Sequence, residues 1–174
     1  PASYTWAGEM GVNLATAFFN PQHHVVQAGI RGYRDALRAQ GIDPSDRQVL
    51  GVIPMYCAAT EEEVLRGWEH TARYLSFFAG LDEIRPHQAP DYEHYKGESR
   101  GSQQMRDVTF EMFDQANLSL IGEPDHIIRK IAWIDEFYDQ PDVLIMEVAQ
   151  GGLDPDLVIP TLELFADAVM PVFT

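Results

Sequence analysis

The sequence is short of cysteine, of basic residues and of long apolar runs. Its single cysteine, Cys57, excludes a framework of internal disulfide bonds. Only 12 Lys and Arg stand against 27 Asp and Glu, and the net charge of −15 argues against nucleic acid and anionic membrane surfaces as partners, because both bind basic patches. No run approaches the roughly 18 apolar residues of a membrane span, so we expect no membrane segment.

Several motifs that mark common active sites are also missing. The sequence has no glycine-rich dinucleotide fingerprint, no P-loop and no nucleophile elbow. Cys57 lies in an apolar stretch, which favours a small buried side chain over a nucleophile. With no signal peptide in the sequence, we expect a cytoplasmic location.

The remaining composition is that of a folded protein. The 174 residues are 45% apolar and 11% aromatic, which predicts one globular domain over residues 1–174. The first residue is Pro1 rather than methionine, so we expect that a segment before Pro1 is missing from this sequence.

Residues 142–173 contain the clearest structural unit. Residues 142–149 form an apolar run rich in β-branched side chains, and a glycine turn and an apolar helical pattern over residues 157–169 follow. Asp154 suits the N-cap of this helix and Pro155 its first position. The near-continuous apolar strand is typical of burial on both faces, as in a parallel sheet covered by helices.

The upstream chain shows the same alternation. The patterns predict a helix over residues 3–11 with Ser3 as its N-cap, a strand over 12–19, a helix over 25–39, a strand over 48–58 and a helix from Thr60 to about Ala79. Pro54 is a defect for a central strand, so we expect a bulge or an early strand end there. Thr60 and Glu63 have the spacing of a capping box.

Residues 81–101 interrupt this rhythm with two prolines and charges of both signs, which predicts an insertion or excursion loop. Helices are then expected over residues 103–116 and 125–138. The pattern gives about three strands separated by helices, and therefore parallel strands with right-handed crossovers.

Three strands leave both edges of a sheet open, and a complete eight-stranded α/β barrel needs about 250 residues. The predicted fold class is therefore α/β: a partial (β/α)8 TIM barrel whose front half is missing, or a half that completes itself by association.

Four stretches of the sequence occur in the order known from one family. They are residues 3–11 (SYTWAGEMG), Tyr33-Arg34 with Gly41 and residues 59–63 (ATEEE), residues 121–125 (IGEPD), and residues 162–166 (LELFA) with 169–171 (VMP). Together they span nearly the whole chain. They resemble the C-terminal half of the bacterial luciferase-like, flavin-dependent monooxygenases.

This resemblance implies a (β/α)8 barrel of which the chain holds the sixth, seventh and eighth strands. The histidine that assists chemistry in the luciferase branch, and several contacts to the flavin ring, lie in the absent front half. The resemblance therefore assigns no catalytic residue to this chain.

The resemblance does imply cofactor-binding residues. The turn over residues 1–5 would cradle the FMN phosphate, with Ser3 giving a hydroxyl and an amide, and Ala2 and Tyr4 giving amides or packing. A helix N-terminus favours an anion in this way. Phe18 would lie near the flavin ring. Ser3 could equally be a plain N-cap, and Phe18 could be a core aromatic of the barrel.

Other residues invite a functional interpretation. His23 and His24 are adjacent at a helix start, which favours exposed turn residues over a metal site. Trp6 is expected to pack between helix and sheet. Glu147, within the last strand, could be functional or could pair with an arginine.

The other polar candidates lie in loops. A cluster of Asp91, Glu93 and His94 favours a solvated loop over a metal site. Gly151 and Gly152 follow the last strand, where they allow either close ligand approach or simply the turn.

The expected function is that of the C-terminal part of an FMN-dependent monooxygenase that oxidises a small organic substrate with O2. Its reduced FMN would come from a partner reductase, and the isolated fragment is expected to be inactive. One alternative is a non-catalytic half-barrel module, whose open edges would be covered as a homo-oligomer or by the missing N-terminal half. Another is a deazaflavin-dependent oxidoreductase of the same superfamily.

Overall fold

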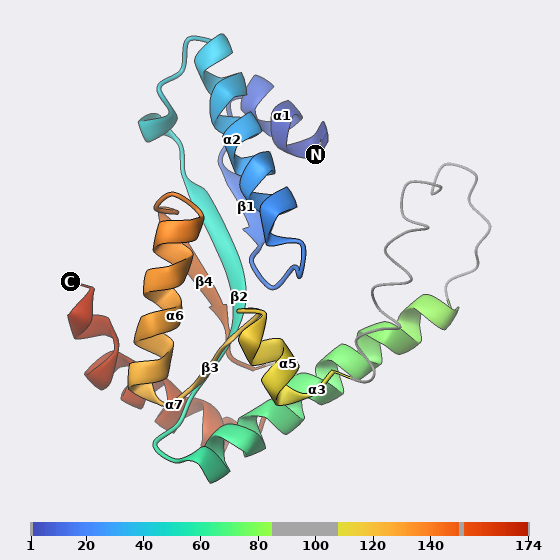
Figure 1. Ribbon diagram of the computed structural model, residues 1–174, viewed down its shortest axis with the longest axis vertical. Helices are drawn as coiled ribbons and strands as arrows, with labels where there is room; N and C mark the ends of the chain where they lie inside the picture. Colours follow the sequence, from blue (N-terminus) through green and yellow to red (C-terminus); the bar gives the residue numbers. More distant parts are fainter. Residues whose placement is uncertain (1, 85–107, 150–151, 174) are drawn as a thin grey trace.

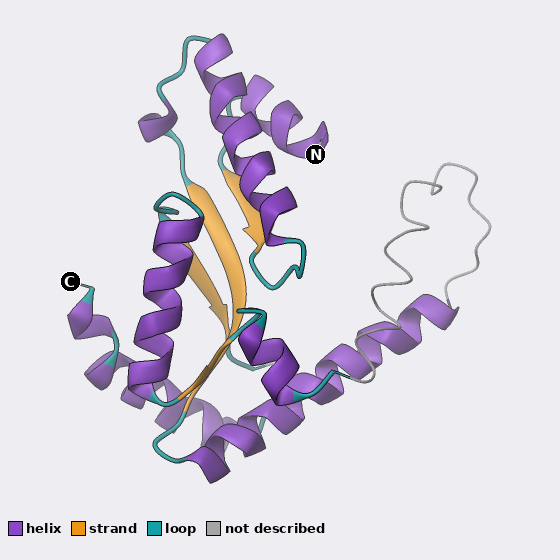
Figure 2. Cartoon of the chain, in the orientation of Figure 1, coloured by secondary structure: helices purple, strands orange, loops and turns teal. Residues whose placement is uncertain are grey.

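The computed structural model describes residues 2–84, 108–149 and 152–173 (Figure 1). The helices are α1 (Ala2–Glu9), α2 (His23–Ala39), α3 (Glu61–Ile84), α5 (Phe110–Gln115), α6 (Pro124–Phe137) and α7 (Pro155–Ala168), with 3-10 turns η1 (Pro44–Asp46) and η5 (Met170–Val172); the strands are β1 (Leu14–Ala17), β2 (Val49–Cys57), β3 (Leu120–Gly122) and β4 (Val143–Glu147). Figure 2 shows the strands at the centre of the molecule with the helices around them. No helix among the described residues is both long and apolar enough to cross a membrane.

The four strands form one parallel sheet, as the alternation of strands and helices predicted. β2 pairs with each of the other three strands, so it is the centre of the sheet. The sequence prediction missed β3. This strand is only three residues long and leads directly into α6, so its apolar residues read as the start of that helix.

The sequence predicted a bulge or an early strand end at Pro54. This prediction was wrong, because β2 continues through Pro54 to Cys57. The amide of Phe18 donates to the carbonyl of Val52, and the amide of Ala58 donates to the carbonyl of Gly122, so even-numbered residues of β2 face the edge shared by β1 and β3. Pairing with β1 stops at Val52 and pairing with β3 starts at residue 55. Pro54 lies between the two partners, where its missing N–H is not needed.

The main core lies between the sheet and the helices α2 and α6. The predicted inward residues of α2 are all buried: Val26, Ile30, Tyr33 and Leu37. At the centre of this core the ring of Phe18 stacks on Tyr138, with centroids 4.0 Å apart and planes 7° from parallel. Gly51 of β2 faces the same ring, and a Cβ at this position would collide with it.

β4 is not buried on both faces, contrary to the expectation from its apolar run. Its residues are half-buried and Ile145 is 40% exposed. In the described part of the chain β4 pairs with β2 alone, and one face lies away from the helices that form the main core. The apolar composition fits a covered strand, but the residues that the structure describes pack the main core against one face only.

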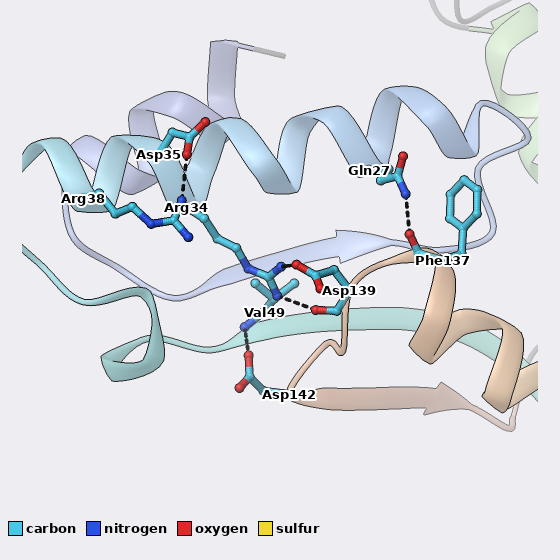
Figure 3. A network of polar contacts seen from close by, with 8 residues as sticks. All are labelled: Gln27, Arg34, Asp35, Arg38, Val49, Phe137, Asp139 and Asp142. Carbon is cyan, nitrogen blue, oxygen red and sulfur yellow. Dashed lines mark hydrogen bonds and ion pairs between the residues drawn. The ribbon is translucent and has the colours of Figure 1, made fainter.

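Polar contacts fix the register where α2, β2 and the turn after α6 meet (Figure 3). Arg34 donates to the carboxylate of Asp139 at 2.6 Å and to its carbonyl at 2.9 Å. Asp142 accepts the amide of Val49 at 2.7 Å, which aligns the starts of β2 and β4. Gln27 donates to the carbonyl of Phe137 at 2.5 Å.

The helix starts agree with the sequence in most places. Thr60 accepts the amide of Glu63 at 3.4 Å, as the capping box predicted, and Asp154 accepts the amide of Asp156 at 3.0 Å. Ser3 is not an N-cap, because α1 already begins at Ala2. The predicted loop over 81–101 lies outside the described residues except for Leu81–Ile84, which belong to α3.

We predict that Gly51→Ala lowers the free energy of unfolding by about 1–3 kcal/mol, because the added methyl group must displace the stacked ring of Phe18. Urea denaturation followed by circular dichroism measures the change. Gly32→Ala is the matched control, since its Cβ would meet only the hydroxyl of Thr5 at 3.7 Å and alanine favours the helix. Equal stability of Gly51→Ala and the native chain would contradict this packing.

Candidate functional site

The sheet has a second face, opposite the main core. Successive side chains of a strand point to opposite faces, and Leu14, Phe18, Val49 and Ile53 belong to the core shared with α2 and α6. The alternate positions therefore point the other way. We call this the inner face, made of Ala15, Ala17, Leu50, Val52, Val143, Ile145 and Glu147. In a closed barrel this face would line the interior.

The N-termini of α1 and α2 both point toward the end of the sheet where the strands finish, since both helices run antiparallel to the strands in a β/α unit (Figure 1). Of the α-helices that the structure describes, only these two lack an acidic residue in the first turn. Ala2 and Ser3 are exposed. Their backbone amides and the positive end of the helix dipole suit an anion.

Tyr4 anchors the start of α1 to the sheet. Its hydroxyl lies 2.6 Å from the hydroxyl of Thr16 in β1, and its ring packs on the open side of Gly29 in α2. Ala2 and Ser3 are thus held beside the last residues of β1. The three predicted phosphate-turn residues lie together, and their contact with a cofactor stays a prediction.

Phe18 and Phe19 point in different directions at the end of β1. Phe18 is fully buried in the main core and stacked on Tyr138, so in this chain its ring is a core side chain. Phe19 is half-buried and packs against the cluster of Leu75, Phe113 and Leu118. The predicted flavin contact of Phe18 is untested, and Phe19 is the aromatic on the other side of the strand.

Glu147 ends β4 on the inner face. It pairs in register with Pro54 of β2, so it lies near the carboxyl ends of the strands. Burial raises the pKa of Tyr74 in α3, and the negative charge of Glu147 raises it further. Tyr74 packs against the same cluster as Phe19.

His23 is not the exposed turn residue that the sequence suggested. Its Nδ1 lies 2.5 Å from the hydroxyl of Tyr138 and its Nε2 lies 2.6 Å from the carbonyl of Ala116. A carbonyl only accepts, so Nε2 carries the proton and Nδ1 accepts from Tyr138. His23 therefore joins the start of α2 to α5 and α6. His24 is exposed and borders a hollow between α1 and α2.

A charged cluster joins α5 to α6. Asp114 Oδ1 lies 2.5 Å from Nζ of Lys130 and 2.8 Å from Nε2 of His126, and Lys130 is buried. Burial raises the pKa of the Asp114 carboxyl, but the hydrogen bonds from Lys130 and His126 outweigh burial, so its pKa lies below the ordinary value. Burial lowers the pKa of Lys130 despite this partner. The cluster holds two helices together.

The remaining candidates do not add to the site. Burial raises the pKa of the Cys57 thiol to about 11, which fits a structural side chain. Among the described residues no three His, Cys, Asp or Glu side chains are grouped to hold a metal ion. Asp91, Glu93, His94 and Gly151 lie outside the described residues, and Gly152 has a positive φ of 73°, as a turn requires. Trp6 does not pack between helix and sheet, since it is 60% exposed.

No protein-family model matches the sequence, and no curated protein matches it. Solved structures do match. Monooxygenase RslO1 from Streptomyces bottropensis is 18% identical with a TM-score of 0.70, over 100% of this chain and 46% of that chain. This chain therefore has the fold of about half of that structure.

Two further structures agree. The oxygenating constituent of 3,6-diketocamphane monooxygenase from Pseudomonas putida, a type II Baeyer–Villiger monooxygenase in complex with FMN, is 22% identical with a TM-score of 0.68, over 97% of this chain and 45% of that chain. The coenzyme F420 dependent tetrahydromethanopterin reductase from Methanopyrus kandleri is 14% identical with a TM-score of 0.63, over 100% of this chain and 49% of that chain. This chain thus spans less than half of these proteins. The predicted partial barrel and the luciferase-like resemblance are confirmed at the level of the fold.

We predict that Asp114→Asn lowers the free energy of unfolding at pH 7 by about 1–3 kcal/mol, because Lys130 stays buried without its counter-charge. The folded-state pKa of Asp114 is depressed, so its stabilisation is present above the ordinary carboxyl pKa of about 3.9 and is lost as the pH falls through the folded-state value. Urea denaturation between pH 2 and 7 measures both effects.

The matched control for this cluster is Asp35→Asn, which removes an exposed carboxylate paired with Arg38 and should change stability little. If Asp114→Asn and Asp35→Asn have the same stability at pH 7, the cluster does not hold α5 to α6.

Proposed function

We propose that this chain is the C-terminal part of a flavin-dependent luciferase-like monooxygenase that oxidises a small organic substrate with O2. The observation that carries the proposal is the partial barrel shared with structures named as monooxygenases, one in complex with FMN. When bound, reduced flavin supplies the electrons that activate O2. The residues of this chain bind and orient the cofactor.

The phosphate part of the site is the start of α1. Backbone amides of Ala2, Ser3 and Tyr4 and the hydroxyl of Ser3 would hold the phosphate, since no carboxylate lies in the first turn of α1 to repel it. The bond between Tyr4 and Thr16 keeps this turn beside the end of β1. FMN is the cofactor that we propose, with the deazaflavin F420 as the competing outcome, because two solved relatives in fold are named for F420.

The rest of the barrel would complete the site. Within the described residues, β1 and β4 each pair only with β2, so each has an edge that can accept a further strand. The exposed inner face would then be enclosed and water excluded from it. We propose that the front half of the barrel, on the same or another polypeptide, supplies the catalytic residues, and that a partner reductase supplies the reduced flavin.

We predict that oxidised FMN binds this 174-residue chain saturably and that Ser3→Ala weakens binding about tenfold, because a hydrogen bond to a charged phosphate is lost. Quenching of flavin fluorescence measures the dissociation constant. Ser76→Ala, at an exposed serine of α3, is the control and should bind like the native chain. F420 binding in place of FMN would favour the deazaflavin alternative, and binding of neither would contradict the proposal.

A second candidate function is assembly without catalysis. Large apolar side chains are exposed on α1 and in the link from α1 to β1: Trp6 at 60%, Met10 at 59% and Val12 at 47%. A monomer seldom exposes such a patch without a partner. A half-barrel of this kind could cover its edges by pairing with a second copy.

We predict for this alternative that the mass measured by sedimentation rises with concentration in the micromolar range. Trp6→Gln should weaken the association about tenfold, because it removes exposed apolar surface from α1. Met112→Gln, which changes an equally exposed residue on α5, should not. A monomer at every concentration would exclude self-assembly.

A further inference from the structure

The last helix, α7, carries apolar side chains on two of its sides. One side is fixed to the rest of the chain, because Thr161 and Phe165 are buried and the Thr161 hydroxyl donates to the carbonyl of Cys57 at 2.9 Å. Further apolar side chains of α7 are exposed, with Ile159 at 57% and Leu162 at 42%. The second apolar side is therefore uncovered in the part of the chain that the structure describes.

The exposed apolar side chains form a stripe along α7. Pro155, Ile159, Leu162 and Ala166 are all exposed, and they follow one another at alternating spacings of four and three residues. Residues at these spacings lie on one side of a helix. An amphipathic partner helix is recognised through anchors with the same spacing. The stripe thus has the form of a surface on which another helix packs.

The stripe points away from the barrel. Successive residues of an α-helix are turned by about 100°, so Ile159 lies roughly 160° around α7 from the buried Thr161, and Ala166 roughly 140°. A strand added at the open edge of β4 would bring its own helix beside α7, in the same outer layer. A neighbour in that layer does not cover a side that faces outward, so the occupant belongs to another protein.

The surface around the stripe is acidic. Asp156, Glu163 and Asp167 are exposed in the row next to the stripe, and none of them forms an ion pair with another described residue. Residues 131–174 contain no Lys, Arg or His. Their acidic residues are Asp135, Glu136, Asp139, Asp142, Glu147, Asp154, Asp156, Glu163 and Asp167. A partner that covers the stripe must therefore bring basic side chains to its border.

We propose that the stripe of α7 binds a basic amphipathic helix of a second protein. The apolar side of that helix covers Ile159, Leu162 and Ala166, and its Lys or Arg side chains pair with the carboxylates in the neighbouring row. A second copy of this chain is a poor occupant, because two acidic rows would meet and repel. The contact needs no flavin, so it is independent of the proposed function.

The test uses two synthetic helical peptides of about 20 residues, each with leucine at the a and d positions of a heptad repeat. One peptide carries Lys at the flanking positions and the other carries Glu. Fluorescence anisotropy measures the binding of each labelled peptide to the 174-residue chain. The Lys peptide should bind saturably and more tightly than the Glu peptide, and added salt should weaken it.

Matched variants locate the contact. Leu162→Gln should weaken the Lys peptide about tenfold, because apolar surface is lost from the stripe. Leu65→Gln is the control, since Leu65 of α3 is 43% exposed and lies outside the stripe. Glu163→Gln should weaken the Lys peptide about threefold through the loss of one ion pair, and Glu69→Gln, at an exposed glutamate of α3, should not. Circular dichroism melting verifies that each variant folds.

The docking site is contradicted if neither peptide binds, if both bind equally, or if Leu65→Gln weakens binding as much as Leu162→Gln does. Sedimentation of the chain alone tests the other occupant. If the chain associates with itself and Leu162→Gln abolishes that association, a second copy covers the stripe and the proposal is wrong. None of these results changes the outcome for FMN, which Ser3→Ala tests separately.

Discussion

The structure depends on β2, the strand that pairs on both of its edges. Its odd-numbered residues bond to β4 and its even-numbered residues bond first to β1 and then to β3. On one face, Gly51 admits the ring of Phe18, and Tyr138 closes the stack. α2 and α6 are thereby packed on the same side of the sheet. His23 and Arg34 then tie α2 to the end of α6.

The packing of α2 and α6 on one side leaves the residues of the inner face partly exposed in the part of the chain that the structure describes, and this is the link to function. The inner face is apolar but partly exposed, with Ile145 at 40%. A face of this composition is stable when other strands or a ligand cover it. The helix N-termini free of acidic residues point toward the carboxyl ends of the strands, where Glu147 ends β4.

Local patterns predicted much of the fold. The apolar spacing of α2 follows from helix geometry, and the parallel order follows from alternating strands and helices. Contacts between residues distant in the sequence were not predictable. His23, for example, forms a hydrogen bond with Tyr138, which lies 115 positions away. Phe18 and Phe19 are adjacent and identical, so only the register of β1 tells which one faces the core. Nothing in the sequence around Lys130 indicates that this residue pairs with Asp114.

The most direct test of the account is amide hydrogen exchange followed residue by residue by NMR at low protein concentration. If β1 and β4 are open edges of a partial barrel, the inward amides of Thr16, Leu144 and Met146 bond to β2 and exchange slowly. The outward amides of Ala15, Ala17 and Ile145 then exchange rapidly. Equal protection of both sets would mean that the edges are already paired, and would contradict the partial barrel.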